Sequence, residues 1–364
     1  MKMNKIQYPV LELDLGQLKE NLAALHQCCQ DSSVKMIGVI KGITADKEVA
    51  KLYDAEGLSY IATSRIDQIR HLKEYGLKTP LMLIRIPMLS ELQDVVSLCD
   101  ASLHSDVTVL RALSKEAEKQ NKVHQVMLMI DLGDLREGFW DPEELIDCAV
   151  EIEKEHPYLE LIGVGVNLSC YGSVKPNLRN MQGLVSLAAD VEKAIGRELP
   201  FISGGASTSF YMLQNGSMPM RVNNLRIGEL ILTGQINGYE PGITHLSACK
   251  LKAEVIEVRE KPSFPVGELE VDAFGEVGHY EDRGIRKRAL VAVGRVDYGD
   301  PFTLTPCMEG VEVLGASSDH TILDVTDAKE EIRVGDVLTF RVKYSSLVYL
   351  SNTESVQIRY VDPN

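Results

Sequence analysis

The sequence lacks long apolar runs, has a deficit of positive charge and contains no paired-cysteine motif. No stretch approaches the roughly 20 apolar residues that cross a bilayer, and residues 1–6 lack the apolar segment of an export signal. Asp and Glu outnumber Lys and Arg by 53 to 38, which argues against a nucleic-acid or anionic-membrane partner. We therefore expect a protein that binds a small molecule.

The seven cysteines follow neither a disulfide nor a metal pattern. Their number is odd, no CxxC occurs, and no Cys/His spacing of a zinc site is present. We expect reduced thiols in a cytoplasmic protein, and no bound metal.

Short β-rich runs alternate with amphipathic helical patterns from about residue 35 to 235. This alternation is typical of βα units around a parallel sheet. Eight such units predict a closed (β/α)8 barrel of the TIM type. A doubly wound open sheet is the alternative, but it would more often carry GxGxxG after its first strand, and none is present. The predicted strands are residues 36–41, 59–63, 81–85, 101–104, 126–131, 161–167, 201–204 and 224–227.

Beyond residue 240 the pattern changes to apolar alternation broken by Gly and Asp turns, with few helix-length segments. We therefore predict an α/β fold in which a barrel domain, residues 1–240, is followed by an all-β domain, residues 241–364. Residues 8–14 also alternate between apolar and polar side chains, so this segment is able to pair with the β domain. The strands predicted there are residues 251–258, 288–294, 321–325, 337–342 and 356–360.

Lys41 ends the apolar run that begins at Met36 and is followed by Gly42. The run is typical of a parallel strand buried on both faces, which delivers one amine to its carboxyl end. Burial lowers the pKa of an ammonium, and a neutral amine is the nucleophile that forms a Schiff base with an aldehyde. For this lysine taken alone, the alternative is a side chain that only extends out of the barrel rim.

Polar residues also follow the later strands, whose carboxyl ends converge on one mouth of a barrel. They include Arg136, Asn167 and Arg226. Residues 203–209 are small or carry hydroxyls and lead into a helix-like stretch at 210–213, a pattern suited to an anion. Gly204-Gly205 alone indicates a tight turn. Together with Lys41, this loop predicts a phosphorylated aldehyde, pyridoxal 5'-phosphate (PLP).

Lys41 and several short segments along nearly the whole chain resemble the alanine/ornithine racemase family of fold-type III PLP enzymes. The resemblance implies a PLP-binding barrel, a C-terminal β domain, and a homodimer in which the partner's β domain closes each active site. The implied activity is racemisation of a free amino acid, with ornithine or lysine favoured. The matching blocks are Lys41, Asp131–Arg136, Ser203–Ser207, Leu225–Glu229, Gly315–His320 and Val342–Tyr344.

The resemblance implies a role for each matching residue. Lys41 would hold PLP and serve as one catalytic base. Arg136 would contact the phenolate oxygen of PLP or the substrate carboxylate, while Asn167 would line the ring. Arg226 would face the pyridine nitrogen. The phosphate would be held by Gly205, Ser207, Thr208, Gly228 and Tyr344, and the partner's Ser318 and Asp319 would bind the substrate carboxylate.

Racemisation calls for a base on each face of the substrate. Alanine racemases supply the second as a tyrosine in a Gly-Tyr-x-Asp context, whereas this chain has Gly-Arg295-Val-Asp-Tyr298. Arginine is a poor base, so Tyr298 and His320 are the catalytic candidates. His320 has the more suitable intrinsic pKa. The alternative for His320 is a histidine that only forms hydrogen bonds within the β domain.

Arg226 bears on the reaction type, because a cation at the pyridine nitrogen weakens the ring as an electron sink and favours reprotonation. The related decarboxylases place a carboxylate at the matching position. Three alternatives stay open: a racemase for alanine or serine, a diamino-acid decarboxylase and a non-catalytic PLP carrier. Glu137 and Glu229 weakly favour a basic substrate, although each alone is typical of a solvated rim charge.

Overall fold

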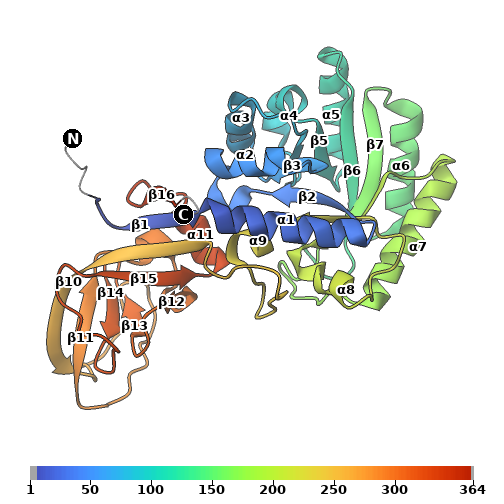
Figure 1. Cartoon of the computed structure of the whole chain (residues 1–364). Coiled ribbons are helices and arrows are strands. Elements are labelled where there is room, and N and C mark those ends of the chain that lie inside the picture. Colours follow the sequence, from blue (N-terminus) through green and yellow to red (C-terminus); the bar gives the residue numbers. More distant parts are fainter. Residues whose placement is uncertain (1–5, 362–364) are drawn as a thin grey trace. The chain divides into compact units, whose positions relative to one another are not determined.

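The computed structural model describes residues 6–361, which divide into two units (Figure 1). One unit runs from Leu18 to His245, and the other combines the residues before Leu18 with those from Leu246 onward. The boundary between His245 and Leu246 falls a few residues after the one expected at residue 240. The predicted absence of an export signal rests on residues that lie mostly outside the described range. Within that range no helix is both long and apolar enough to span a bilayer.

The unit from Leu18 to His245 is a closed barrel of eight parallel strands, which confirms the predicted fold. Strands β2 and β9 pair with each other and close the cylinder. The strands are β2 (Lys35–Val39), β3 (Tyr60–Thr63), β4 (Leu81–Leu83), β5 (Ala101–His104), β6 (His124–Ile130), β7 (Leu159–Val166), β8 (Phe201–Ala206) and β9 (Asn224–Ile227). The helices are α1 (Leu15–Asp31), α2 (Lys47–Ala55), α3 (Ile66–Glu74), α4 (Leu92–Leu98), α5 (Val107–Lys119), α6 (Pro142–Glu155), α7 (Leu178–Ile195), α8 (Tyr211–Gln214) and α9 (Glu229–Thr233). Short 3-10 turns are η1 (Lys41–Ile43), η2 (Leu89–Glu91) and η3 (Ser207–Ser209).

Strand β2 shows how the barrel is filled on both faces. Ile37 and Val39 belong to an apolar cluster with residues of the other strands. Gly38 points the opposite way, where a Cβ would come within 2.6 Å of the ring of Tyr53 on α2. A larger residue at Gly38 would therefore push the helix off the strand. The strand itself ends at Val39 rather than at residue 41, so Lys41 lies in η1, just beyond the sheet.

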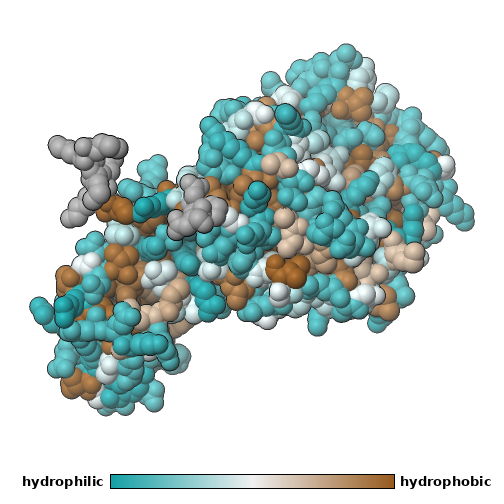
Figure 2. Space-filling model, viewed as in Figure 1, coloured by the Kyte–Doolittle hydropathy of each residue, from teal (hydrophilic) through white to brown (hydrophobic). Residues whose placement is uncertain are grey.

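The C-terminal unit is an eight-stranded, mostly antiparallel sheet that includes the first strand of the chain. Strand β1 (Val10–Asp14) pairs with β10 (Cys249–Pro262) and runs parallel to β16 (Gln357–Val361). The other strands are β11 (Ile285–Val291), β12 (Leu304–Pro306), β13 (Glu312–Ala316), β14 (Thr321–Asp324) and β15 (Val337–Val342). The unit also holds the 3-10 turn η4 (Pro301–Thr303) and two short helices, α10 (Arg295–Tyr298) and α11 (Tyr344–Leu350). Residues 295–298 are therefore helical, although the sequence pattern predicted few helices in this half. The face seen in Figure 2 is largely hydrophilic, with apolar residues at scattered places.

Candidate active site

Lys41 begins η1, directly after the carboxyl end of β2. Burial lowers the pKa of its amine, and the positive charges of Arg136 and Arg226 lower it further. Cys170 and Glu137 act on the same amine in the opposite direction. The amine is therefore poised to lose its proton more easily than a solvated lysine.

Arg226 lies on β9 with 3% of its surface exposed. Its guanidinium donates to the carbonyl of Val166 at 2.8 Å, to the hydroxyl of Ser203 and to Oδ1 of Asn167 at 2.6 Å. Burial lowers the pKa of Arg226 to about 10, so the group stays cationic at neutral pH. The guanidinium is thus a fixed positive charge held by polar atoms of β8 and of the end of β7.

Arg136 and Glu137 extend this network from the loop after β6. The guanidinium of Arg136 donates to both carboxylate oxygens of Glu137, to one of them at 2.6 Å. The same carboxylate accepts a hydrogen bond from Nδ2 of Asn167. Burial alone would lower the pKa of Arg136, but the bond to Glu137 raises it. Glu137 is therefore not the solvated rim charge that its sequence context indicated.

The loop that carries these residues is closed on itself. The amide of Phe139 donates to the carbonyl of Met129 at 2.8 Å, and the amide of Asp131 donates to the carbonyl of Phe139 at 3.0 Å. Gly138 makes this return possible, because its φ is +137° and a Cβ there would lie 2.3 Å from the amide nitrogen of Asp131. The carboxylate of Asp131 accepts the amides of Gly133 and Leu135.

The loop after β8 places small and hydroxyl-bearing residues beside the end of β9. Oγ of Ser207 accepts the amide of Gly228 at 3.1 Å, and Gly228 in turn fits so closely against Val39 that a Cβ would lie 2.8 Å from its carbonyl oxygen. Thr208 donates its hydroxyl to the carbonyl of Leu168. Gly205, with φ +106°, lets the chain turn against Ser209. The hydroxyl of Ser209 is buried without a partner among residues 6–361. Amides and hydroxyls that could hold an anion are thus present.

Asp134 stabilises the neighbouring loop, 169–174. Its carboxylate accepts four backbone amides, those of residues 169, 170, 171 and 174, at 2.9–3.1 Å. Burial alone would raise the pKa of Asp134, but these bonds lower it. The carboxylate stays ionised and holds Cys170 in the loop beside the lysine and the arginines.

Glu229 is the first residue of α9 and lies near Lys41. Burial raises the pKa of its carboxyl to about 7, although the charge of Lys41 opposes this shift. At neutral pH it is therefore only partly ionised, unlike a solvated glutamate.

The remaining predicted site residues belong to the C-terminal unit. Ser318, Asp319 and His320 form most of the turn between β13 and β14, which is closed by the amide of residue 317 donating to the carbonyl of His320. Asp319 and His320 are exposed. Gly294 packs against this turn so tightly that a Cβ would lie 2.1 Å from the carbonyl oxygen of Ser318. Tyr344 is the first residue of α11 and is partly exposed.

Tyr298 is fully buried at the end of α10. Its hydroxyl is 2.5 Å from that of Thr321, and Thr321 donates its own proton to the carbonyl of Val293 at 2.7 Å. Tyr298 must therefore be the donor in the first bond. Burial raises the pKa of this phenol to about 12. Both features make Tyr298 a poor proton acceptor.

Arg295 is held by a hairpin-like segment of its own unit. Its guanidinium lies 4.0 Å from the ring centroid of Phe274, donates to Glu276 at 2.7 Å and lies 3.6 Å from Asp272. The bond to Glu276 raises the pKa of Arg295. The side chain is thus fixed as a cation and cannot serve as a base.

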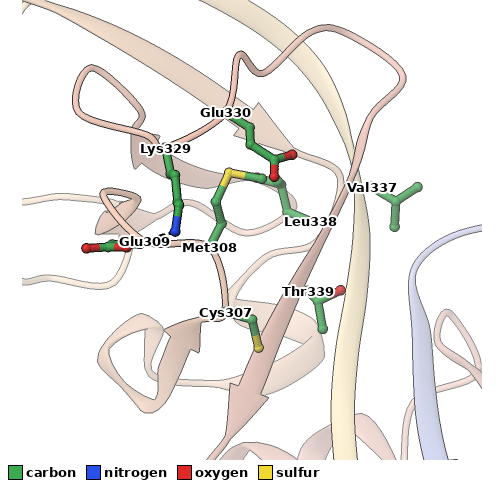
Figure 3. Close-up of a pocket in the computed structure, with 8 residues that line it drawn as sticks. All are labelled: Cys307, Met308, Glu309, Lys329, Glu330, Val337, Leu338 and Thr339. Carbon is green, nitrogen blue, oxygen red and sulfur yellow. Dashed lines mark ion pairs between the residues drawn. The ribbon is translucent and has the colours of Figure 1, made fainter.

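A cavity of about 440 Å³ lies in the C-terminal unit (Figure 3). Its lining includes Cys307, Met308 and an ion pair between Lys329 and Glu309 at 3.6 Å. None of the predicted site residues lines it. Among residues 6–361 no group of acidic, histidine or cysteine side chains is placed to hold a metal.

Hydrogen bonds therefore link Arg136, Asn167 and Arg226 through Glu137, and separately Ser207 and Gly228. Three residues outside the predicted site set support them. Ser203, Glu137 and Asp134 position Arg226, Arg136 and the loop around Cys170. Ser203 lies near the end of one predicted strand, and Asp134 and Glu137 follow another, and that position was the signal that could have identified them. Their bonding depends on loop conformations that the sequence pattern does not reveal.

Comparisons with known proteins show the family of the chain. The family model described as "Alanine racemase, N-terminal domain" matches residues 13–235. Ornithine racemase of Acetoanaerobium sticklandii is 41% identical over 96% of this chain and 99% of its own length. Lysine racemase of Thermotoga maritima is 36% identical over 97% of this chain and 98% of its own. Alanine racemase of Clostridium difficile 630 has the same fold, with a TM-score of 0.74 at 19% identity over 98% of this chain and 97% of that structure.

The chain belongs to the alanine racemase family. Its full-length curated relatives are amino-acid racemases, which confirms the class of enzyme predicted from the sequence.

Proposed function

We propose that the protein is a PLP-dependent racemase that interconverts the L and D forms of ornithine. Similarity to ornithine racemase over nearly the whole of both chains supports this substrate. Lysine is the second candidate, because the similarity to lysine racemase is equally extensive. The observation that carries the reaction type is the buried guanidinium of Arg226, where the related decarboxylases have a carboxylate.

The barrel residues fit PLP. Its aldehyde needs a neutral amine, and burial lowers the pKa of Lys41. Its phosphate needs hydroxyl and amide donors, which Ser207, Gly228 and the Ser209 hydroxyl, buried without a partner among residues 6–361, offer. An anion would take over the Gly228 amide that Ser207 now accepts and would free the Ser207 hydroxyl to donate. When bound, PLP supplies an electron sink that makes the α-hydrogen of an amino acid acidic.

The side chains of this protein would then direct the proton. Nζ of Lys41 would remove and return it on one face. Arg226, held by Ser203 and Asn167, would present a fixed cation to the bound cofactor, which would weaken it as an electron sink and favour reprotonation. The imidazole of His320 is the second base: it is exposed on a turn, whereas the phenol of Tyr298 is buried and already donates its proton.

We also propose a homodimer in which the turn at residues 317–320 of one copy completes the barrel site of the other. The exposure of Asp319 and His320 supports this arrangement, because a turn that serves a neighbouring chain must be accessible. Ser318 and Asp319 would bind the substrate carboxylate beside Arg136. All seven cysteines are free thiols, which agrees with a cytoplasmic setting.

The alternatives are distinguishable by product. A racemase for alanine or serine would change the optical rotation of those amino acids faster than that of ornithine. A diamino-acid decarboxylase would release CO₂ from labelled ornithine. A PLP carrier would bind the cofactor and leave the rotation of every amino acid unchanged.

The deciding experiment traps PLP on the protein with borohydride and identifies the modified lysine by peptide mass spectrometry. We expect the label on Lys41, and we expect L-ornithine to lose its rotation without being consumed. Lys41→Ala should lose both the label and all turnover. Lys35→Ala, at the other and exposed end of β2, is the matched control and should keep both. Labelling that persists in Lys41→Ala would overturn the assignment.

A further inference from the structure

Glu137 connects the two arginines of the barrel site. One of its oxygens accepts both Arg136, at 2.6 Å, and Nδ2 of Asn167, while the other accepts Nε of Arg136. The far end of the same Asn167 amide accepts Arg226 at 2.6 Å. A continuous chain of hydrogen bonds therefore runs from the loop after β6, through the end of β7, to β9.

Glu137 is also one of the groups whose charge opposes the effect of the two arginines on Lys41. Those groups are Arg136, Arg226, Cys170, Glu137 and Glu229. Two are permanent cations, and the carboxyl of Glu229 is only partly ionised at neutral pH because burial raises its pKa to about 7. Cys170 acts on the Lys41 amine in the same direction as Glu137. Only Glu137 has both carboxylate oxygens bonded to cationic or amide donors of the site.

We infer that Glu137 is a positioning residue, which holds Arg136 directly and Arg226 through Asn167, and so fixes the charges that surround the Lys41 amine. The inference rests on the proposed function, because it gives Lys41 its role. Both oxygens of Glu137 already accept hydrogen bonds from side chains of the site. Its effect on the reaction is exerted through its neighbours.

The test measures how the labelling of Lys41 by PLP and borohydride depends on pH. Glu137→Gln keeps the shape of the side chain and removes its charge. Without that charge, the effect of the two arginines on Lys41 is opposed less strongly, so the amine loses its proton at lower pH. We expect the midpoint of labelling to move down by roughly one pH unit, and Glu137→Asp, which keeps the charge, to move it back toward the wild type.

Glu153→Gln is the matched control. Glu153 lies on α6 and is paired with Arg197 through both oxygens. The side-chain exposures of this pair, 37% and 26%, resemble the 38% and 20% of Arg136 and Glu137. Glu153→Gln removes the same charge from an equivalent ion pair outside the site, and its labelling midpoint should equal that of the wild type.

Arg136→Gln changes the other partner of the Arg136–Glu137 ion pair. It keeps the inference testable even if Glu137→Gln does not fold. It removes a cation and leaves the carboxylate in place, so the midpoint should move up. A midpoint that stays with the control in either variant would overturn the inference and leave the proposed function intact. A wild-type protein that is never labelled at Lys41 would instead overturn the proposed function.

Discussion

His320 and Tyr298 are two candidate bases that the structure places in opposite environments. His320 is exposed on a turn, and Tyr298 is buried with its proton donated to Thr321. A proton acceptor must reach its substrate and be free to accept. The position of the side chain therefore separates these residues more sharply than their intrinsic chemistry does.

We expect His320→Gln to lower kcat for racemisation by about 10²–10⁴-fold, the range for loss of a general base. Tyr298→Phe should keep kcat within a few-fold and lower the free energy of unfolding by about 1 kcal/mol, because one buried hydrogen bond is lost. Steady-state polarimetry and urea unfolding of both variants make the comparison. The reverse pattern would assign the second base to Tyr298.

The position of Lys41 beside the carboxyl end of a buried strand was predictable, because a continuous apolar run leads into it, while its role stays a prediction. The partner of Glu137 was not predictable, since adjacent residues rarely face each other in regular structure. Its ion pair with Arg136 arises in a loop whose return depends on the positive φ of Gly138. Arg295 is similar: its cation–π contact with Phe274 comes from residues about 20 positions away in an irregular segment.

At the scale of elements, strands β5 and β6 contain a polar cluster between the barrel and its helices. Oγ of Ser102 lies 2.7 Å from Nε2 of both His104 and His124. The two Nδ1 atoms are buried with no partner in the range that the structure describes. Burial lowers the pKa of each histidine to about 3, so both are neutral in the folded protein.

These histidines should make the barrel sensitive to acid. An unfolded histidine takes up a proton below about pH 6.5, whereas the folded ones resist it, so stability falls as pH drops below that value. Each histidine contributes up to about 1.4 kcal/mol per pH unit. Urea unfolding at pH 7.5 and 5.5 measures the loss.

In His124→Gln the loss between these two pH values should shrink, because one of the two groups no longer titrates. His71→Gln, which changes an exposed histidine on α3, is the control and should leave the loss unchanged. An equal pH dependence in all three proteins would contradict the interpretation of the cluster.

The barrel elements were predictable because both faces of each strand are buried, and continuous apolar runs therefore mark them. The match is complete for residues 224–227, which form β9. Strands β12 and β13 were not predicted, since one has three residues and the other contains Gly315 at an irregular register. Helix α10 was missed because four residues are too few for helical periodicity to show.

For the whole molecule, the proposed dimer makes a quantitative prediction. If each site takes Lys41 from one chain and His320 from the other, a mixed dimer of Lys41→Ala and His320→Gln subunits has one intact site and one site with both changes. Random exchange in a symmetric dimer then restores about a quarter of wild-type activity. Neither variant alone should show this activity.

The measurement denatures and refolds the two variants together and follows ornithine racemisation. The same treatment of each variant alone is the control. If both residues act within one chain, the mixture stays as inactive as its components, and the shared-site proposal fails. Sedimentation analysis of the wild type gives the oligomeric state independently.

The pairing of strand β1 bears on the order in which parts of the protein fold during synthesis. It lies between β10 and β16 and so takes neighbours from both the middle and the end of the chain. During translation at about 5–20 residues per second, Val10 waits tens of seconds for Gln357 to leave the ribosome. All barrel strands are synthesised in that interval, so the cylinder can close while the amino-terminal strand still lacks one edge partner.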